Sequence, residues 1–186
     1  IFTIVAKNYI GLAQVLGQSL KNHVKADFFI IVADEFENES KERYQNSSEI
    51  LIAKDILDIT DSLWYELAFK YNLVEFCTAI KPASIKYFFN EKKYKKVVYV
   101  DPDVYFYSSG NHIFSLLEKH SIVLTPHILK LQKEFKGDYP DYLFLLNGTF
   151  NLGFIGLSES SATQNFLDWW HNRLLSYCYF DNDKGL

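Results

Sequence analysis

The sequence has little cysteine and no long apolar run. Its 186 residues include two cysteines, Cys77 and Cys178, and neither has the spacing of a metal-ligand motif. We therefore expect two free, buried thiols in a reducing compartment. No apolar segment approaches the roughly 18 residues of a membrane-spanning helix, and no charged-then-apolar leader opens the chain. These absences predict a cytoplasmic protein with at most peripheral contact with the inner face of a membrane.

An excess of positive charge is also absent. The chain has 19 Lys and Arg against 23 Asp and Glu, and its formal net charge is −4. Such a chain has no general surface for polyanions, so nucleic acid is not an expected partner. The charge of a phosphate ligand would have to be met locally by a metal, a lysine or a helix N-terminus. The length and the 48% of hydrophobic residues predict one globular domain without repeats or linkers.

The hydrophobic pattern predicts alternating strands and helices. Residues 2–6 form a first expected strand, residues 10–23 an amphipathic helix and residues 27–32 a second, buried strand. Such a unit implies parallel pairing with a right-handed crossover. We therefore expect an α/β protein, a three-layer α/β/α sandwich with a mostly parallel central sheet. Further strands are expected at 49–53, 96–100, 121–124 and 149–157, and further helices at 62–71, 73–80, 82–90, 112–120 and 160–178.

Helix ends and one helix face are also predictable. Asp61, Asn72 and Asn111 each precede an expected helix and have side chains suited to an N-cap. Residues 34–48 are polar and are expected to form a solvated loop or short helix. The apolar face of the last helix is expected to bury five side chains, which are Ala162, Phe166, Trp169, Trp170 and Leu174.

Two carboxylates follow the most strand-like segment of the chain. Residues 97–100 are three valines and a tyrosine, and Asp101 and Asp103 come directly afterwards, separated by the strand-breaking Pro102. One interpretation is a turn, in which aspartate is common. The other is a metal site, because like charges a few Å apart need a cation or a shared proton between them. Oxygen ligands favour Mg²⁺ or Mn²⁺, and open α/β sheets bind ligands at the carboxyl ends of their strands.

Other polar residues have a functional and an ordinary interpretation. Lys81 precedes Pro82, so we expect it at a helix break, either facing an anion or simply solvated. His127 follows an expected strand and lies at the same edge of the sheet, or it is an ordinary surface histidine. Asn151 and Gly153 lie in a strand, where a glycine indicates either a close ligand or a bulge without function.

Four lysines are clustered just before the central strand. They are Lys92, Lys93, Lys95 and Lys96. They suit a polar loop, and the alternative is a weak anchor to acidic lipid, at about 1 kcal/mol per lysine.

Four motifs, spread in order over nearly the whole chain, resemble GT-A nucleotide-sugar glycosyltransferases, especially bacterial enzymes close to the family-8 type. In that family the first motif holds the nucleobase, the second carries a basic residue facing the diphosphate, the third is the D-x-D metal motif and the fourth is an Asn-x-Gly strand. In this chain the motifs are residues 2–9, 77–82, 98–103 and 150–154.

The resemblance implies metal-dependent transfer of a sugar from a nucleotide-sugar donor, first of all a UDP-sugar, to a glycan or lipid-linked acceptor. Asp101 and Asp103 would hold Mn²⁺ or Mg²⁺, and Lys81 would add positive charge at the leaving diphosphate. The donor would contact Ala6, Lys7, Asn8, Tyr9, Lys81, Asp101, Pro102 and Asp103. On the substrate or acceptor side we expect His127, Asn151 and Gly153.

The chain departs from the family pattern at its end. Family-8 enzymes usually carry an Asp-Gln pair after the Asn-x-Gly strand and a further metal-binding histidine near the C-terminus. Here Asp181 and Asp183 follow the last helix, and neither is assignable to those roles. We therefore expect residues 1–186 to be a single GT-A-like domain without its C-terminal part, weakly active or inactive by itself.

Two other classes of protein compete with this hypothesis. A haloacid-dehalogenase-like phosphatase would use Asp101 as nucleophile. It needs a later strand ending in paired aspartates, but the candidates Asp138 and Asp141 do not follow a strand-like segment. A catalytically inactive domain that binds nucleotide or glycan is the third class, and the presence of both carboxylates and Lys81 argues against it.

Overall fold

The computed structural model describes residues 1–36, 49–130, 142, 144 and 148–180. Its centre is a six-stranded sheet with the strand order β3-β2-β1-β4-β6-β5. The strands are β1 (Phe2–Val5), β2 (Phe29–Val32), β3 (Ile50–Ile52), β4 (Lys96–Val100), β5 (Ile122–Pro126) and β6 (Phe150–Ser158). Neighbours from β3 to β4 pair in parallel, whereas β6 runs antiparallel to both β4 and β5. The predicted mostly parallel α/β sheet is confirmed.

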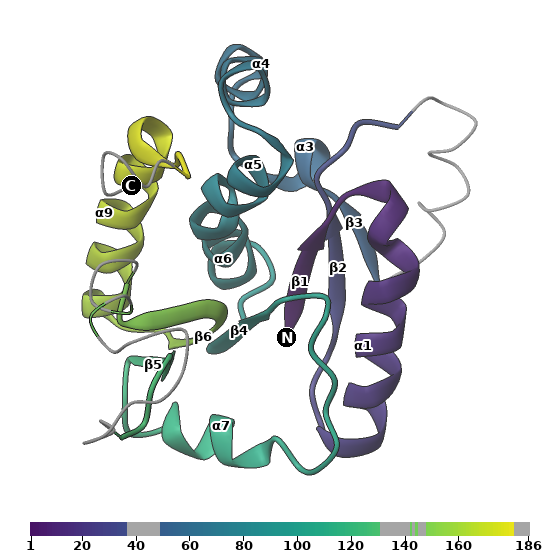
Figure 1. Ribbon diagram of the computed structural model, residues 1–186, viewed down its shortest axis with the longest axis vertical. Helices are drawn as coiled ribbons and strands as arrows, with labels where there is room; N and C mark the ends of the chain where they lie inside the picture. The colour runs from purple at the N-terminus through teal and green to yellow at the C-terminus, as the bar shows by residue number, and fades with distance from the viewer. Residues whose placement is uncertain (37–48, 131–141, 143, 145–147, 181–186) are drawn as a thin grey trace.

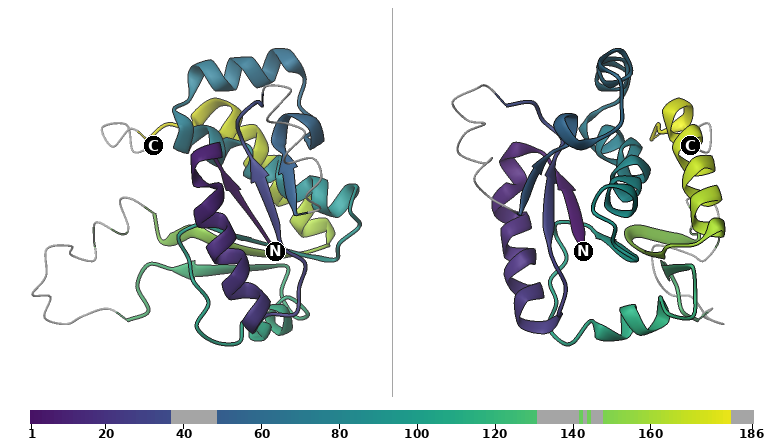
Figure 2. Two further views of the ribbon diagram at one scale, coloured as in Figure 1. Left: turned by 90° about the vertical axis from the view of Figure 1, so that its right-hand side faces the viewer. Right: turned by 180° about the vertical axis from the view of Figure 1, so that it is seen from behind.

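Helices cover both faces of this sheet, so the predicted three layers are also confirmed (Figures 1 and 2). One face carries α1 (Ile10–His23) and α7 (Asn111–Leu116). The other face carries α4 (Asp61–Lys70), α5 (Leu73–Ala79), α6 (Lys81–Asn90) and α9 (Ser161–Tyr177). Two short elements complete the described chain, namely the 3-10 turn η1 (Lys7–Tyr9) and α3 (Ala53–Ile56).

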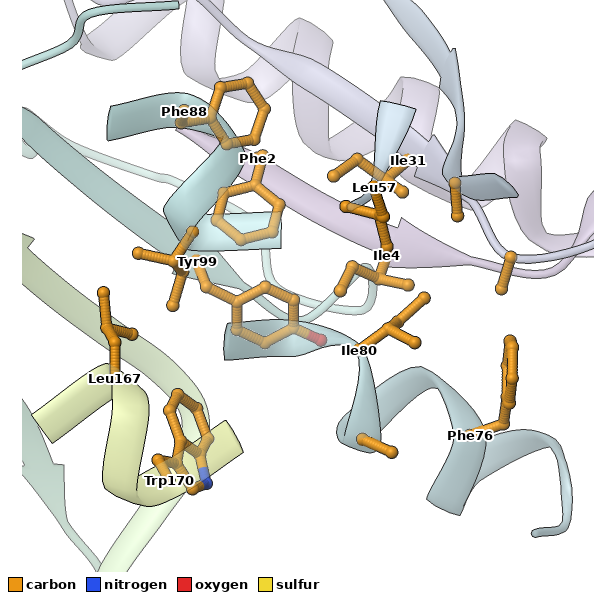
Figure 3. Packing of buried hydrophobic residues seen from close by; sticks show 14 of the residues in the cluster. Phe2, Ile4, Ile31, Leu57, Phe76, Ile80, Phe88, Tyr99, Leu167 and Trp170 are labelled. Atoms are coloured by element: carbon orange, nitrogen blue, oxygen red, sulfur yellow. The ribbon is translucent and has the colours of Figure 1, made fainter. Parts of the chain in front are cut away.

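The central strands are apolar throughout because both of their faces are buried. In β4, Val97 and Tyr99 pack into the cluster under α5, α6 and α9, and Val98 and Val100 pack into the cluster under α1. This division follows from the two-residue period of a strand. Figure 3 shows the Tyr99 ring in the first cluster, between the Phe2 ring and the α9 side chains Leu167 and Trp170.

One of the three predicted helix caps is confirmed and two are wrong. Asn72 caps α5, because its side chain accepts hydrogen bonds from the backbone amides of Val74 and Glu75. The Glu75 side chain in turn accepts a hydrogen bond from the Asn72 amide, which completes a capping box. Thr60, not Asp61, caps α4, through a 3.3 Å bond from the Leu63 amide. Where two cap-forming residues are adjacent, their local patterns do not show which one leaves the helical conformation.

The third predicted cap, Asn111, is the first residue of α7, and Gly110 takes the cap position. The break between α5 and α6 falls at Ile80, one residue before the predicted break at Lys81, so Lys81 begins α6 and Pro82 is its second residue. The strand predicted at 49–53 is shorter, because Ala53 already starts α3.

The buried stripe of α9 differs from the predicted one. It consists of Thr163, Leu167 and Trp170. Trp169 is 58% exposed, and Ala162 is exposed as well. Neighbouring helix residues are about 100° apart, so the two adjacent tryptophans do not share one face.

Two of the four clustered lysines have acidic partners. Lys95 pairs with Glu159, and Lys96 pairs with Glu118 at 3.1 Å. These pairs reduce the positive charge that a lipid surface would meet, and lipid contact stays a prediction. Among the helices of residues 1–36, 49–130 and 148–180, none has the length and apolar character needed to cross a bilayer.

Several sequence-based expectations fall outside the described residues. They concern most of the polar segment 34–48, the aspartates Asp138 and Asp141 with the segment before them, and Asp181 and Asp183.

Replacing Asn72 with alanine is expected to lower the free energy of unfolding by about 1 kcal/mol, because the capping box of α5 is lost. Asn111→Ala is the matched control, since Asn111 is exposed and its side chain caps no helix. Urea titrations followed by circular dichroism measure both changes. Equal losses in the two variants would contradict the assignment of the caps.

Candidate functional site

A cavity of about 480 Å³ opens at the carboxyl ends of β1 and β4. Three parts of the chain supply its walls: the end of β1 with η1 and α1, helix α5 with the start of α6, and the end of β4 beside β6. Its lining residues are Ile4, Val5, Ala6, Tyr9, Leu12, Leu73, Val74, Cys77, Thr78, Lys81, Tyr99, Asp101, Pro102, Asp103, Leu152 and Gly153.

The backbone holds the end of β4 against β6. The Asp101 amide donates a 2.8 Å hydrogen bond to the Gly153 carbonyl, and the Val104 amide donates to the Asp101 carbonyl at 3.2 Å. Pro102 lies within this turn and has no amide hydrogen to continue the strand. Asp101 and Asp103 therefore both reach the cavity from a fixed turn.

The Asp101 carboxylate is oriented by a buried tyrosine. The Tyr99 hydroxyl donates a 2.5 Å hydrogen bond to Asp101 Oδ1. The Lys81 ammonium lies 3.8 Å from the same oxygen. Burial and the Asp101 charge raise the pKa of Tyr99 well above its ordinary value, so the hydroxyl stays protonated and donates.

Gly153 leaves room beside the other Asp101 oxygen. A Cβ at Gly153 would lie 2.8 Å from Asp101 Oδ2 and 2.8 Å from the Asn151 side-chain oxygen, closer than ordinary contacts allow. Asn151 is held there by the 2.7 Å hydrogen bond that its side-chain oxygen accepts from the Gly153 amide. A side chain at position 153 would thus collide with its neighbours, which explains the glycine. The space in front of Gly153 is bordered by Asp101 Oδ2 and the Asn151 side-chain oxygen.

Lys81 is a buried cation with long contacts. It is 6% exposed, and its Nζ lies 3.4 Å from the Leu152 carbonyl and 4.2 Å from the centre of the Tyr99 ring. Burial lowers the pKa of Lys81, and the nearby Asp101 carboxylate opposes this shift. An ammonium has three donors, so these long contacts leave it suited to an anion entering the cavity.

Four predicted site residues do not line the cavity. The Lys7 side chain donates to the Glu35 carbonyl at 2.7 Å and lies over the Phe36 ring. Asn8 is exposed in η1. His127 is also exposed, and its Nδ1 lies 2.8 Å from the Gly148 carbonyl. Asn151 is outside the lining as well, but it contacts the cavity residue Gly153.

The oxygen atoms at this site provide part of the ligand set that a divalent cation needs. Asp101 and Asp103 offer carboxylate oxygens, which hard cations such as Mg²⁺ and Mn²⁺ prefer. The space that a Cβ at Gly153 would fill lies directly beside Asp101 Oδ2. Within the part of the chain that the structure describes, no group of three or more His, Cys, Asp or Glu side chains is placed to hold a metal. A cation here would therefore need oxygens from its ligand or from water as well.

Several cavity residues were not predicted. Tyr99 was assigned only to the strand, although strand alternation places it on the same face as Asp101. Leu73, Val74 and Thr78 reach the cavity because α5 passes its opening. Local sequence patterns carry no signal for that helix position.

Comparison with known proteins supports the fold. No family model matches the sequence. A Bacillus subtilis protein described as "Uncharacterized protein YfnF" is 25% identical over 178 residues, which is 95% of this chain and 58% of YfnF. The galactosyltransferase LgtC, solved with donor and acceptor sugar analogues, superposes with a TM-score of 0.54 at 16% identity, over 98% of this chain and 60% of LgtC. The chain has the GT-A glycosyltransferase fold.

Two further glycosyltransferase structures share this fold. Mouse xyloside xylosyltransferase 1 has a TM-score of 0.51 at 14% identity and is matched over 93% of this chain and 70% of its own. The bifunctional glycosyltransferase WbbM has a TM-score of 0.51 at 14% identity, over 95% of this chain and 33% of its own. The chain thus spans less than two thirds of the lengths of YfnF, LgtC and WbbM.

The two buried thiols are expected to make the free energy of unfolding depend on pH. Burial raises the pKa of Cys77 and of Cys178 to about 11 from 9.0. Below pH 9 the thiols are protonated in both the folded and the unfolded chain, so they do not make the free energy of unfolding change with pH and their full stabilisation is present. Between these values the unfolded chain releases the protons first, so the free energy of unfolding falls as pH rises, by at most about 1.4 kcal/mol per thiol and pH unit.

Urea titrations between about pH 8 and about pH 10.5 measure this fall. The double variant Cys77→Ala, Cys178→Ala is expected to lose less stability over the same range, because it has no thiols to ionise. Parallel pH profiles for the double variant and the unsubstituted protein would contradict the expectation.

Proposed function

We propose that this chain carries the donor-binding part of a metal-dependent glycosyltransferase. It would take a nucleotide sugar, first of all a UDP-sugar, and transfer the sugar to a glycan or lipid-linked acceptor. The observation that carries the proposal is the meeting of Asp101, Asp103 and the buried Lys81 at one cavity of a GT-A fold. Two carboxylates and an ammonium suit a diphosphate that is bound together with a cation.

Each of these residues has a defined task in the proposal. Asp101 and Asp103 hold Mn²⁺ or Mg²⁺, which when bound neutralises charge on the diphosphate leaving group. Lys81 meets the same charge from the floor of the cavity, where burial strengthens the attraction. Neither aspartate needs to act as a nucleophile, because both serve the leaving group.

The remaining predicted residues divide by position. Ala6 and Tyr9 line the cavity at the end of β1, and the half-exposed Tyr9 ring suits stacking on a nucleobase. Asn8 is close in sequence but lies outside the lining. Asn151 and Gly153 lie beside Asp101, and in this proposal they would contact the sugar or the acceptor.

The structure favours this proposal over a phosphatase. Asp101 Oδ1 already accepts a hydrogen bond from Tyr99 and lies near Lys81, which suits a fixed ligand better than an attacking nucleophile. The GT-A fold likeness points the same way. A phosphatase would instead form an aspartyl phosphate on Asp101, and trapping that species would overturn the proposal.

Thermal denaturation with Mn²⁺ and a panel of nucleotide sugars tests the donor. One nucleotide sugar is expected to stabilise the protein only when Mn²⁺ is present, by about 2.7 kcal/mol at roughly 100 times its Kd. Asp101→Asn is expected to abolish this stabilisation and to leave the fold intact. Asp58→Asn is the matched control, because Asp58 is exposed and lies away from the cavity.

Two results would count against the donor site. One is equal stabilisation of the Asp101→Asn variant, which would place the nucleotide elsewhere. The other is stabilisation that does not depend on Mn²⁺, which would remove the metal from the proposal. Binding without sugar turnover in a longer form of the protein would favour an inactive nucleotide-binding domain.

A methyl group at Gly153 is expected to disturb the same site. Gly153→Ala places a carbon 2.8 Å from Asp101 Oδ2, so the carboxylate must move and Mn²⁺-dependent nucleotide binding weakens. Gly156→Ala is the control on the same strand, because the nearest atoms to its Cβ would be those of the flexible Leu117 side chain, at 3.3 Å, and not those of Asp101. Calorimetric titration of UDP with Mn²⁺ measures both variants, and unchanged affinity in Gly153→Ala would contradict the assignment.

A further inference from the structure

We propose that Tyr99 is a positioning residue that determines which oxygen of Asp101 is presented to the cation. The proposal rests on the function proposed above, because it assumes that Asp101 ligates a divalent metal. It concerns a buried core residue that the sequence patterns assigned only to packing.

The two oxygens of Asp101 have different surroundings. Oδ1 accepts the 2.5 Å hydrogen bond from the Tyr99 hydroxyl, and the Lys81 ammonium lies 3.8 Å from it. Oδ2 lies over Gly153, 2.8 Å from the point where a Cβ would be. One oxygen is therefore occupied by donors from the buried side, and the other is turned toward the open space in front of Gly153.

The Tyr99 hydroxyl has little freedom to move away. The residue is 2% exposed, and its ring packs edge-on against Phe2 at a centroid distance of 5.4 Å. Lys81 lies on the ring at 4.2 Å. Figure 3 shows the ring enclosed in the buried cluster, with its hydroxyl oxygen toward Ile4 and Ile80. A donor fixed in this way holds the carboxylate in one rotation about its Cβ–Cγ bond.

Loss of the hydroxyl would leave Lys81 as the near donor to Oδ1. The long Lys81 contact orients the carboxylate less strictly than a 2.5 Å bond does, so Asp101 would rotate toward the ammonium. Residues that orient a metal ligand in this way typically change metal affinity by about 10–100-fold when they are removed. Tyr99 thus contributes to cation binding without touching the cation.

Mn²⁺ binding to Tyr99→Phe tests the proposal. Free Mn²⁺ is followed by its electron paramagnetic resonance signal during titration of the protein, with UDP present, and the Kd is expected to rise about tenfold or more. Tyr71→Phe is the matched control. Tyr71 is also buried, and its hydroxyl donates a 2.7 Å hydrogen bond to the Leu174 carbonyl, away from the cavity. This control is expected to lose similar thermal stability and to keep the Mn²⁺ affinity of the unsubstituted protein.

The outcomes separate this proposal from the function on which it rests. If the unsubstituted protein binds Mn²⁺, Asp101→Asn loses it and Tyr99→Phe does not weaken it, the positioning role is wrong and the metal site stands. A similar loss of affinity in Tyr71→Phe would also overturn it, because a general loss of stability would then explain both. No Mn²⁺ binding by the unsubstituted protein would overturn both proposals.

Discussion

The hydrogen bond from Tyr99 to Asp101 joins the buried core to the open cavity. Its donor lies in the larger of the two apolar clusters among the described residues, and its acceptor follows the central strand β4. The acceptor carboxylate lies two residues from Asp103, and neighbouring carboxylates are stabilised by hydrogen-bond donors or cations near them. Lys81 supplies a cation and Tyr99 a hydrogen-bond donor to Asp101 from the buried side of the site. The packing of α6 on the sheet therefore also positions a charge partner for Asp101.

Much of the fold was predictable because its signals are local. A strand buried on both faces is a run of apolar residues, and the α1 pattern repeats with the helix period, so β1, α1 and β2 were found within a residue or two of their observed ends. The caps show the limit. Asn72 is the single cap-forming residue directly before its helix, whereas Thr60 and Asp61 are adjacent and the sequence does not show which of them leaves the helical conformation.

The site was predictable where its residues carry their own signal. Asp101, Asp103 and Lys81 stand next to prolines that mark the ends of elements, and the structure brings all three to one cavity. Lys7 carries a charge that suits a phosphate, but its side chain contacts Glu35 and Phe36 and does not line the cavity. That contact joins segments far apart in the chain, and no spacing rule contains it.

The antiparallel position of β6 between β4 and β5 has a consequence for how the chain folds. β6 lies between β4 and β5, and Val100 pairs with Phe154 across a long stretch of intervening chain. Closing such a loop costs more entropy than forming the neighbouring β1-α1-β2 unit, so the half of the sheet containing β1 is able to form before the other. The amide of Asp101 donates across this junction to Gly153, and its exchange with solvent deuterium therefore reports opening of the β4–β6 pairing at the edge of the cavity.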